Sequence, residues 1–141
     1  MGATTWGSEE GYTTNSTDNF VAYCWQKVAG MQDFGSYVGN GNSDGPFIYT
    51  GFRPRMLFTL KDNSTSGWRV RDTERSPNNP TIKILWWSLN FQQYSNSSQY
   101  PFDILANGFK LRTGTSDFNN NGDTYFYGAW ADVPAKYNNS L

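Results

Sequence analysis

The sequence predicts an all-β protein: an antiparallel, jelly-roll-like β-sandwich with about eight strands and long loops rich in glycine and asparagine. Aromatic residues make up 18% of the 141 residues and charged residues only 16%, against about 25% charged in a typical domain. Good helix formers are scarce, whereas Gly, Asn, Thr and aromatic residues are frequent. Short apolar segments also alternate with turn signals along the chain, the pattern of sandwiches and jelly rolls.

Three strands are expected before the middle of the chain. Segment 19–28 is apolar on both faces, so we expect it to be covered on both sides. The glycine-rich segment 30–45 is interpreted as loops around a short strand centred on 37–38. Another strand is expected at 47–49, followed by a corner in which Pro54 interrupts the pairing.

Two further strands, 56–61 and 68–71, are expected to form a hairpin because the polar turn 62–67 joins them. Side chains alternate between the two faces of a strand. We expect the apolar set to point into the core, namely Met56, Phe58, Leu60, Trp68 and Val70. In that arrangement, Arg69 and Arg71 point out to solvent.

The next predicted strand, 82–89, carries two adjacent tryptophans. Trp86 and Trp87 must point to opposite faces, so one of them faces away from the main core. The following segment, 88–99, is polar and rich in amides, and we interpret it as a surface excursion.

A second hairpin is expected at 102–105 and 108–112. It turns at Asn107-Gly108, a strong signal for a short hairpin. The last strand is expected at 124–130. The chain is long enough for one domain with a core of its own, without disulfides or a metal.

The chain is expected to consist of one β-sandwich domain, 19–141, preceded by a polar arm, 1–18. The arm is rich in Gly and Thr and has no apolar core of its own. Such an arm is either unstructured or ordered against a neighbouring subunit.

Several classes of function are excluded by composition. The chain has no histidine and one cysteine, which excludes Ser–His–Asp and Cys–His catalysis, His-ligated zinc and intrachain disulfides. The net charge of −1 argues against nucleic acid or an anionic membrane surface as partner. No apolar run approaches the roughly 20 residues that span a bilayer, and no signal peptide opens the sequence.

One segment matches the first half of a calcium-binding loop. Its oxygen-bearing side chains alternate and a glycine follows; the side chains are those of Asp117, Asn119, Asn121 and Asp123. The twelfth position is Gly128, where the motif needs a bidentate glutamate, so an Asn/Gly turn is the favoured interpretation. We expect no metal and no cofactor.

The carboxylates do not suggest a catalytic pair. Glu9 and Glu10 lie in the arm, and Glu74 is flanked by arginines, which favours a solvated ion network. Asp103 lies between two apolar residues and is expected to make a structural hydrogen bond. The chain also has no P-loop and no nucleophile elbow, so we expect no enzymatic activity.

Three N-x-Ser/Thr sequons begin at Asn15, Asn63 and Asn96. Chance alone is expected to produce such motifs in a chain rich in Asn and Ser. The sequons therefore do not predict glycosylation.

Exposed aromatic residues are the remaining functional signal. Trp87, Tyr94 and Tyr100 lie in or beside the amide-rich segment and are candidate ligand-binding residues. An aromatic ring beside Asn, Gln and Ser side chains is suited to stacking on a sugar. The same features describe a subunit interface, which is enriched in aromatic residues and poor in charge. We favour the interface, because the chain has more apolar surface than one thin sandwich can hide.

Four segments resemble a domain of bacteriophage virion proteins, of tail-fibre and appendage type, from marine and cyanobacterial phages. They occur in order at 35–54 (GSYVGNGNSDGPFIYTGFRP), 67–72 (GWRVRD), 102–112 (FDILANGFKLR) and 121–131 (NGDTYFYGAWA). The segment 82–100, with its double tryptophan, does not align with that domain. The resemblance implies a structural or host-recognition domain and supplies no catalytic residues.

We therefore expect a non-enzymatic virion structural protein on the external surface of a phage, as a capsid decoration, head fibre or tail appendage subunit. The expected partners are sister copies in a homo-oligomer, for which a trimer is one candidate symmetry, other virion proteins and a host-surface glycan. The alternative is a lectin-like carbohydrate-binding module that uses exposed Trp and Tyr side chains.

Overall fold

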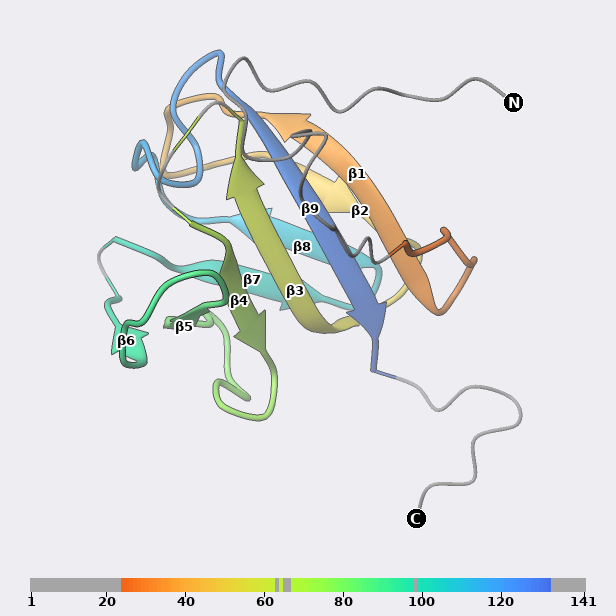
Figure 1. The fold of residues 1–141 in the computed structure, drawn as a ribbon. Coiled ribbons are helices and arrows are strands. Elements are labelled where there is room, and N and C mark those ends of the chain that lie inside the picture. The colour runs from red at the N-terminus through yellow and green to blue at the C-terminus, as the bar shows by residue number, and fades with distance from the viewer. Residues whose placement is uncertain (1–23, 63, 65–66, 98, 133–141) are drawn as a thin grey trace, which may run out of the picture.

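The structure is a computed structural model that describes residues 24–132 except positions 63, 65, 66 and 98. In this part of the chain there are nine strands and no helix, and thus no helical segment that could span a membrane. The strands are β1 Gln32–Val38, β2 Phe47–Tyr49, β3 Pro54–Lys61, β4 Arg69–Asp72, β5 Lys83–Trp86, β6 Tyr94–Ser95, β7 Phe102–Leu105, β8 Gly108–Leu111 and β9 Thr124–Ala131. They form two antiparallel sheets, which confirms the predicted β-sandwich (Figure 1).

The larger sheet has six strands in the order β1-β9-β3-β4-β5-β6, and the smaller has three in the order β2-β8-β7. The last strand, β9, lies between β1 and β3 and runs the length of both (Figure 1). Its pairing with β1 extends from Gln32 opposite Trp130 to Val38 opposite Thr124. This long-range pairing joins the two ends of the described chain.

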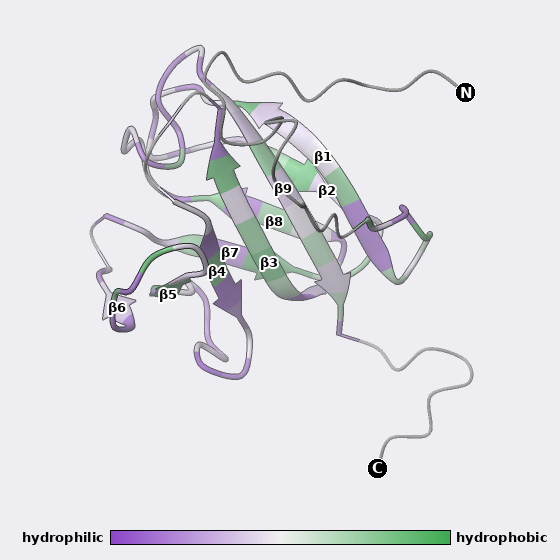
Figure 2. Cartoon of the chain, viewed as in Figure 1, coloured by the Kyte–Doolittle hydropathy of each residue, from purple (hydrophilic) through white to green (hydrophobic). Residues whose placement is uncertain are grey.

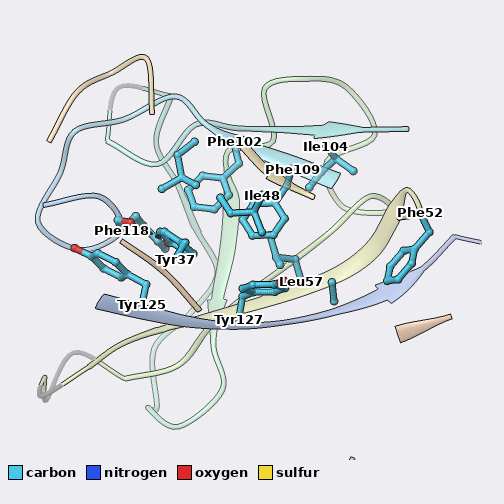
Figure 3. Packing of buried hydrophobic residues seen from close by; sticks show 12 residues of the cluster. Tyr37, Ile48, Phe52, Leu57, Phe102, Ile104, Phe109, Phe118, Tyr125 and Tyr127 are labelled. Atoms are coloured by element: carbon cyan, nitrogen blue, oxygen red, sulfur yellow. Dashed lines mark hydrogen bonds between the residues drawn. The ribbon is translucent and has the colours of Figure 1, made fainter. Parts of the chain in front are cut away.

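The hydrophobic core lies between the two sheets (Figure 3). The larger sheet contributes mainly residues of β1, β3 and β9, and the smaller sheet contributes residues of all three of its strands. The buried members are Tyr37, Ile48, Phe52, Leu57, Phe102, Ile104, Phe109, Leu111, Phe118, Tyr125, Tyr127 and Ala129. Burial of so many rings stabilises the sandwich by both area and ring-edge contacts.

Both predicted hairpins are present. Strand β3 pairs with β4, and β7 pairs with β8 through the turn at Ala106-Asn107. The strand at 47–49 is confirmed as β2, and the strand near Tyr37 is longer than expected. The predicted strand 82–89 is shorter, since β5 ends at Trp86, and the excursion 88–99 contains the short strand β6.

The predicted orientation of β3 and β4 is wrong. Leu57 lies in the core cluster, whereas Trp68 is 38% exposed on the opposite face. Arg69 and Arg71, expected in solvent, are 4% and 1% exposed and lie between the sheets. Met56, Phe58, Leu60 and Val70 therefore face outward from the sandwich. The predicted alternation is present, but the opposite side faces the core; the prediction of the side is wrong because both faces of β3 carry apolar side chains.

The buried arginines are accommodated by aromatic rings and backbone carbonyls. The Arg71 guanidinium lies 3.8 Å from the centre of the Phe102 ring and 4.8 Å from that of Phe118. Its Nη1 donates to the carbonyl of Tyr100 at 2.7 Å. Arg69 donates to the Asp117 carboxylate at 3.0 Å. Ring stacking and carbonyls thus replace water around Arg71, and burial lowers the pKa of this guanidinium to about 9.

The predicted strand at 19–28 is not formed in its described part. Residues 24–27 have no strand pairing, and Val28 makes an isolated bridge to Gln32 around a turn in which Gly30 has φ of 75°. Trp25 packs its ring over Phe34 instead. Residues 19–23, the arm 1–18 and the sequon residues Asn15 and Asn63 lie outside the described residues.

The hydropathy of the strands does not by itself mark the buried face. In Figure 2, β3 is coloured largely as hydrophobic, whereas β9 is pale although half of its residues are aromatic. Tyrosine and tryptophan have intermediate hydropathy because each carries one polar atom. A hydropathy pattern therefore underestimates how apolar β9 is on both of its faces.

Buried phenols make the fold sensitive to alkaline pH. Burial raises the pKa of Tyr37, Tyr125 and Tyr127 above the ordinary value of 10.0. Tyr37 donates its hydroxyl to the carbonyl of Phe118 at 2.9 Å, and Tyr127 donates to the Asp33 carboxylate at 2.6 Å. Above pH 10 the unfolded chain releases these protons while the folded protein keeps them. The contribution of the buried phenols to the free energy of unfolding is therefore fully present below pH 10 and is progressively lost above it.

We expect the free energy of unfolding to fall as pH rises above 10, with a slope that reflects several protons. Arg71 acts in the opposite direction because its pKa is lowered, but it is one group against four tyrosines, since the pKa of Tyr100 is raised by burial as well. Urea unfolding across this pH range measures the slope, and Tyr37→Phe should reduce it by about one proton. A free energy of unfolding that stays constant above pH 10 would contradict the conclusion that these tyrosines are buried in their protonated form.

Candidate functional site

The outer face of the six-stranded sheet, which points away from the core, carries a row of aromatic rings. We call this row the outer ladder; it consists of Phe34, Trp130, Phe58, Trp68 and Trp87. These residues come from or directly flank β1, β9, β3, β4 and β5, in the order in which the strands pair. The alternation of each strand places one ring of the row on this face.

The ladder is continuous across five strands. The ring centres of Phe34 and Trp130 are 5.3 Å apart, and those of Trp130 and Phe58 are 5.7 Å apart. Phe58 continues to Trp68 at 5.2 Å, and Trp68 meets Trp87 edge to face at 6.4 Å. The Trp87 amide donates to the Trp68 carbonyl at 2.8 Å, which fixes the two indoles side by side.

The ladder is only partly covered. Trp87 is 53% exposed, and Trp25 lies over the row against Phe34 and Trp130. Trp25, Trp68, Trp87 and Ser88 line a hollow of about 590 Å³, and no charged residue is among these described lining residues. A second hollow of about 510 Å³ lies along the ladder between Phe34, Phe58 and Phe126. The face therefore presents shaped apolar surface rather than isolated rings.

A glycine makes room for the ladder at its centre. A Cβ atom at Gly128 of β9 would lie 2.4 Å from Cε1 of Phe58 and 2.9 Å from Cδ1 of Phe34. Both rings therefore rest directly on the backbone of β9. The glycine is needed here for close approach of side chains.

Gly128→Ala is expected to lower the free energy of unfolding by about 1–3 kcal/mol, because the added methyl group forces the Phe58 ring away. Urea unfolding followed by tryptophan fluorescence would measure the loss. Gly122→Ala makes no comparable clash, although its φ of 83° adds some backbone strain. A Gly128 variant no less stable than wild type would show that the ladder rings do not need this space.

A second aromatic group lies at the β5–β6 end of the larger sheet, and we call it the edge cluster. It consists of Trp86, Phe91, Tyr94 and Tyr100, which lie in or near β5 and β6. Trp86 pairs with Arg69 and Tyr94 with Ile84 in the sheet register, so both lie on the inner face. Tyr94 is nevertheless 41% exposed, so the cover of the inner face ends before β6.

The edge cluster is joined to the core through Tyr100. The centres of the Tyr94 and Tyr100 rings are 5.7 Å apart, and that of Phe118 lies 5.3 Å from Tyr100. The Tyr100 hydroxyl donates to Oδ2 of Asp117 at 3.2 Å. Burial, followed by the Asp117 charge, raises the pKa of Tyr100. The cluster is thus an exposed extension of a rigid interior.

The structure separates the three predicted ligand-binding residues. Tyr94 and Tyr100 are neighbours in the edge cluster, but Trp87 lies in the outer ladder with Phe58 and Trp68. Trp86, adjacent in sequence, contacts Tyr94 in place of Trp87. The two tryptophans do point to opposite sides, as the strand pattern predicted.

The residues of the calcium-loop motif make contacts with other protein groups. Asp117 pairs with Arg69 at 3.0 Å, and Asp123 pairs with Lys61 at 2.6 Å. Asn119 is buried and binds the loop that follows β1, whereas Asn121 is exposed. Within the described residues, no three acidic, Cys or His side chains gather as metal ligands.

The remaining candidate carboxylates form ion pairs on the surface. Glu74 pairs with Arg55 at 2.9 Å, and Asp103 pairs with Arg112 at 2.8 Å. Asp103 is thus held by the side chain of the residue that directly follows the neighbouring strand β8. These contacts agree with the structural roles expected from the sequence.

Sequence reasoning missed most of the outer ladder. The sequence predicts Trp130 at the end of the last strand but Phe34 in a loop, and their shared face follows from the pairing of β1 with β9. That pairing joins segments about ninety residues apart and has no local signal. The recurrence of aromatic residues on alternate positions of several strands was the available hint.

Comparison with known proteins gives one viral relative. The chain is 28% identical over 88 residues to a "Capsid protein VP1" of Hamster parvovirus H1, which covers 62% of this chain and 11% of the relative. The chain therefore spans only about a tenth of that protein's length. No solved structure gave a significant match.

A family model matches residues 1–134, nearly the whole sequence. This range includes both aromatic surfaces and all nine strands. The chain belongs to the family described as a domain of unknown function, DUF7483.

Proposed function

We propose that this chain is a non-enzymatic structural subunit of a virion, which assembles with other copies through the outer ladder. The observation that carries the proposal is the ladder itself, a continuous aromatic face that the described part of the chain leaves partly exposed. Large contiguous apolar patches are uncommon on the surface of monomeric proteins. Aromatic enrichment and the absence of charge are typical of the centre of a subunit interface.

The comparisons support the same proposal. The relative with the matching segment is a capsid protein, and the resemblance of the glycine-rich and hairpin segments is to phage appendage domains. We propose a place on the outside of a phage particle, as a capsid decoration, head fibre or tail appendage. In such a particle, many copies and neighbouring virion proteins would share the burial of the ladder.

Light scattering of the full chain in solution tests the assembly. We expect a stable homo-oligomer, and we expect the double variant Trp68→Ser, Trp87→Ser to shift the protein toward monomer. These two indoles form the exposed end of the ladder, so their loss removes interface area without removing core residues.

Tyr49→Ser is the matched control. Tyr49 is 66% exposed on β2, in the other sheet, so its loss should leave the oligomer intact. A wild-type chain that is a monomer at all accessible concentrations would refute the proposal. Equal dissociation in the Tyr49 variant would show that the interface lies elsewhere.

A further inference from the structure

The edge cluster lies in a long segment without charge. From Ile84 to Phe102 the sequence contains no Asp, Glu, Lys or Arg, although it is rich in Asn, Gln and Ser. In the structure this segment forms the end of the larger sheet, with β6 as the last strand (Figure 1). Such a segment contributes no charge of its own to the long-range attraction of a charged partner.

The rings of the cluster form an angled platform. Trp86 meets Phe91 at 5.5 Å and Tyr94 at 6.1 Å between ring centres, both nearly edge to face. Phe91 is 61% exposed and Tyr94 is 41% exposed, so ring surface is open to solvent. Tyr100 fixes the platform to the core through Phe118, so the rings are held before any ligand arrives.

Amides border the platform. Asn96 Nδ2 donates to the Tyr94 hydroxyl at 3.2 Å and to Oε1 of Gln99 at 3.0 Å, and the backbone N–H of Gln99 donates back to Asn96 Oδ1 at 3.0 Å. These bonds hold the turn after β6 against the Tyr94 ring. Neutral donors and acceptors thus stand beside exposed aromatic faces.

We propose that the edge cluster binds a neutral polysaccharide, with a sugar ring stacked on Tyr94 and hydroxyls bonded by the amides of the β5–β7 segment. A sugar has an apolar face of C–H groups and a rim of hydroxyls, which matches rings bordered by uncharged amides. A surface that binds a protein partner more typically contains arginine side chains and has a dry apolar centre. The outer ladder, whose lining is almost wholly apolar, offers a sugar few such hydrogen bonds.

This binding goes beyond assembly and uses a different surface. Trp86 and Trp87 point to opposite sides of β5, so copies that bury the ladder leave the edge cluster open. An assembled particle would then display many weak sites at once, which raises the overall affinity for a surface polysaccharide.

The test is a titration of the full chain with three neutral oligosaccharides, cellohexaose, maltohexaose and mannohexaose, followed by tryptophan fluorescence and calorimetry. Oligogalacturonate serves as the charged probe. We expect at least one neutral probe to bind and Tyr94→Ala to weaken that binding by about tenfold, the equivalent of one lost ring stack. Tyr94→Phe keeps the ring and should retain most of the affinity.

Tyr49→Ala is the matched control, because it removes an exposed ring from β2 in the other sheet, outside both the outer ladder and the edge cluster. Thermal unfolding of each variant establishes that it is folded before its affinity is compared. Binding that resists Tyr94→Ala in a folded variant would overturn the proposal. So would equal weakening by Tyr49→Ala, binding of the charged probe alone, or no binding of any neutral probe.

Discussion

Arg71→Ala is expected to lower the free energy of unfolding by about 3 kcal/mol, one of the largest losses that a single substitution causes in this fold. The arginine is fully buried, and its guanidinium lies against the rings of Phe102 and Phe118. Alanine would leave a cavity between these rings and would remove the donor that serves the carbonyl of Tyr100.

Two further variants separate packing from charge. No carboxylate pairs with Arg71 in the described part of the chain, and its Nε and Nη2 have no hydrogen-bond partner there. Burial of the charge itself therefore lowers the free energy of unfolding. Methionine fills most of the volume of the arginine side chain without this charge, so Arg71→Met should lower the free energy of unfolding by less than about 1.5 kcal/mol. Arg71→Lys should lose at least as much as alanine, because an ammonium cannot stack flat on the rings.

Urea unfolding at neutral pH measures all three variants. Arg55→Ala is the surface control, since Arg55 is half exposed and pairs only with surface carboxylates, and it should change stability by less than about 1 kcal/mol. A loss for Arg71→Ala as small as that for Arg55→Ala would show that the guanidinium is not packed at the centre of the sandwich.

The arginines also mark the limit of what the sequence could predict. The alternation in 68–71 located β4 and its hairpin with β3 correctly. Alternation alone divides a strand into two faces, however, and it does not say which face is inside. The usual rule that apolar side chains point inward failed because Phe102 and Phe118, far away in the chain, provide a ring-lined place for the guanidinium groups.

The same limit applies to the candidate site. The opposite directions of Trp86 and Trp87 follow from strand geometry and were predictable, as was the proximity of aromatic rings and amides in 88–99. The grouping of Tyr94 with Tyr100 and Trp86 depends on the pairing of β5 with β6, and the ladder depends on the position of β9 between β1 and β3. Neither of these pairings can be predicted from the sequence of one segment alone.

Asn119→Asp is the second substitution expected to have a large effect, although it changes only one group of atoms. Asn119 is fully buried, and its Nδ2 donates to three oxygen atoms at 2.8 Å: Oδ1 of Asn40 and the carbonyls of Asn42 and Thr113. Its Oδ1 accepts from the backbone N–H of Asn40 at 2.8 Å. The side chain thus ties the loop after β1 to the segment between β8 and β9.

In the aspartate variant, a second oxygen would face these three oxygens without a proton between them. We expect a loss of about 3–5 kcal/mol at neutral pH, the range for an uncompensated buried charge. Protonation of the new carboxyl would restore one donor, so part of the loss should be recovered at acidic pH. Urea unfolding at neutral and acidic pH, compared with wild type under the same conditions, measures both effects.

Asn121→Asp is the matched control, because Asn121 lies two residues further along the same turn and is exposed. It introduces the same charge into the same segment and should change stability by less than about 0.5 kcal/mol. Equal losses in the two variants would mean that the charge of the turn, rather than the buried amide, determines stability.

Asn119 holds the glycine-rich loop against the end of the sandwich, so Asn119→Asp should also release that loop. Limited proteolysis of the variant would detect the release as earlier cleavage within 39–45.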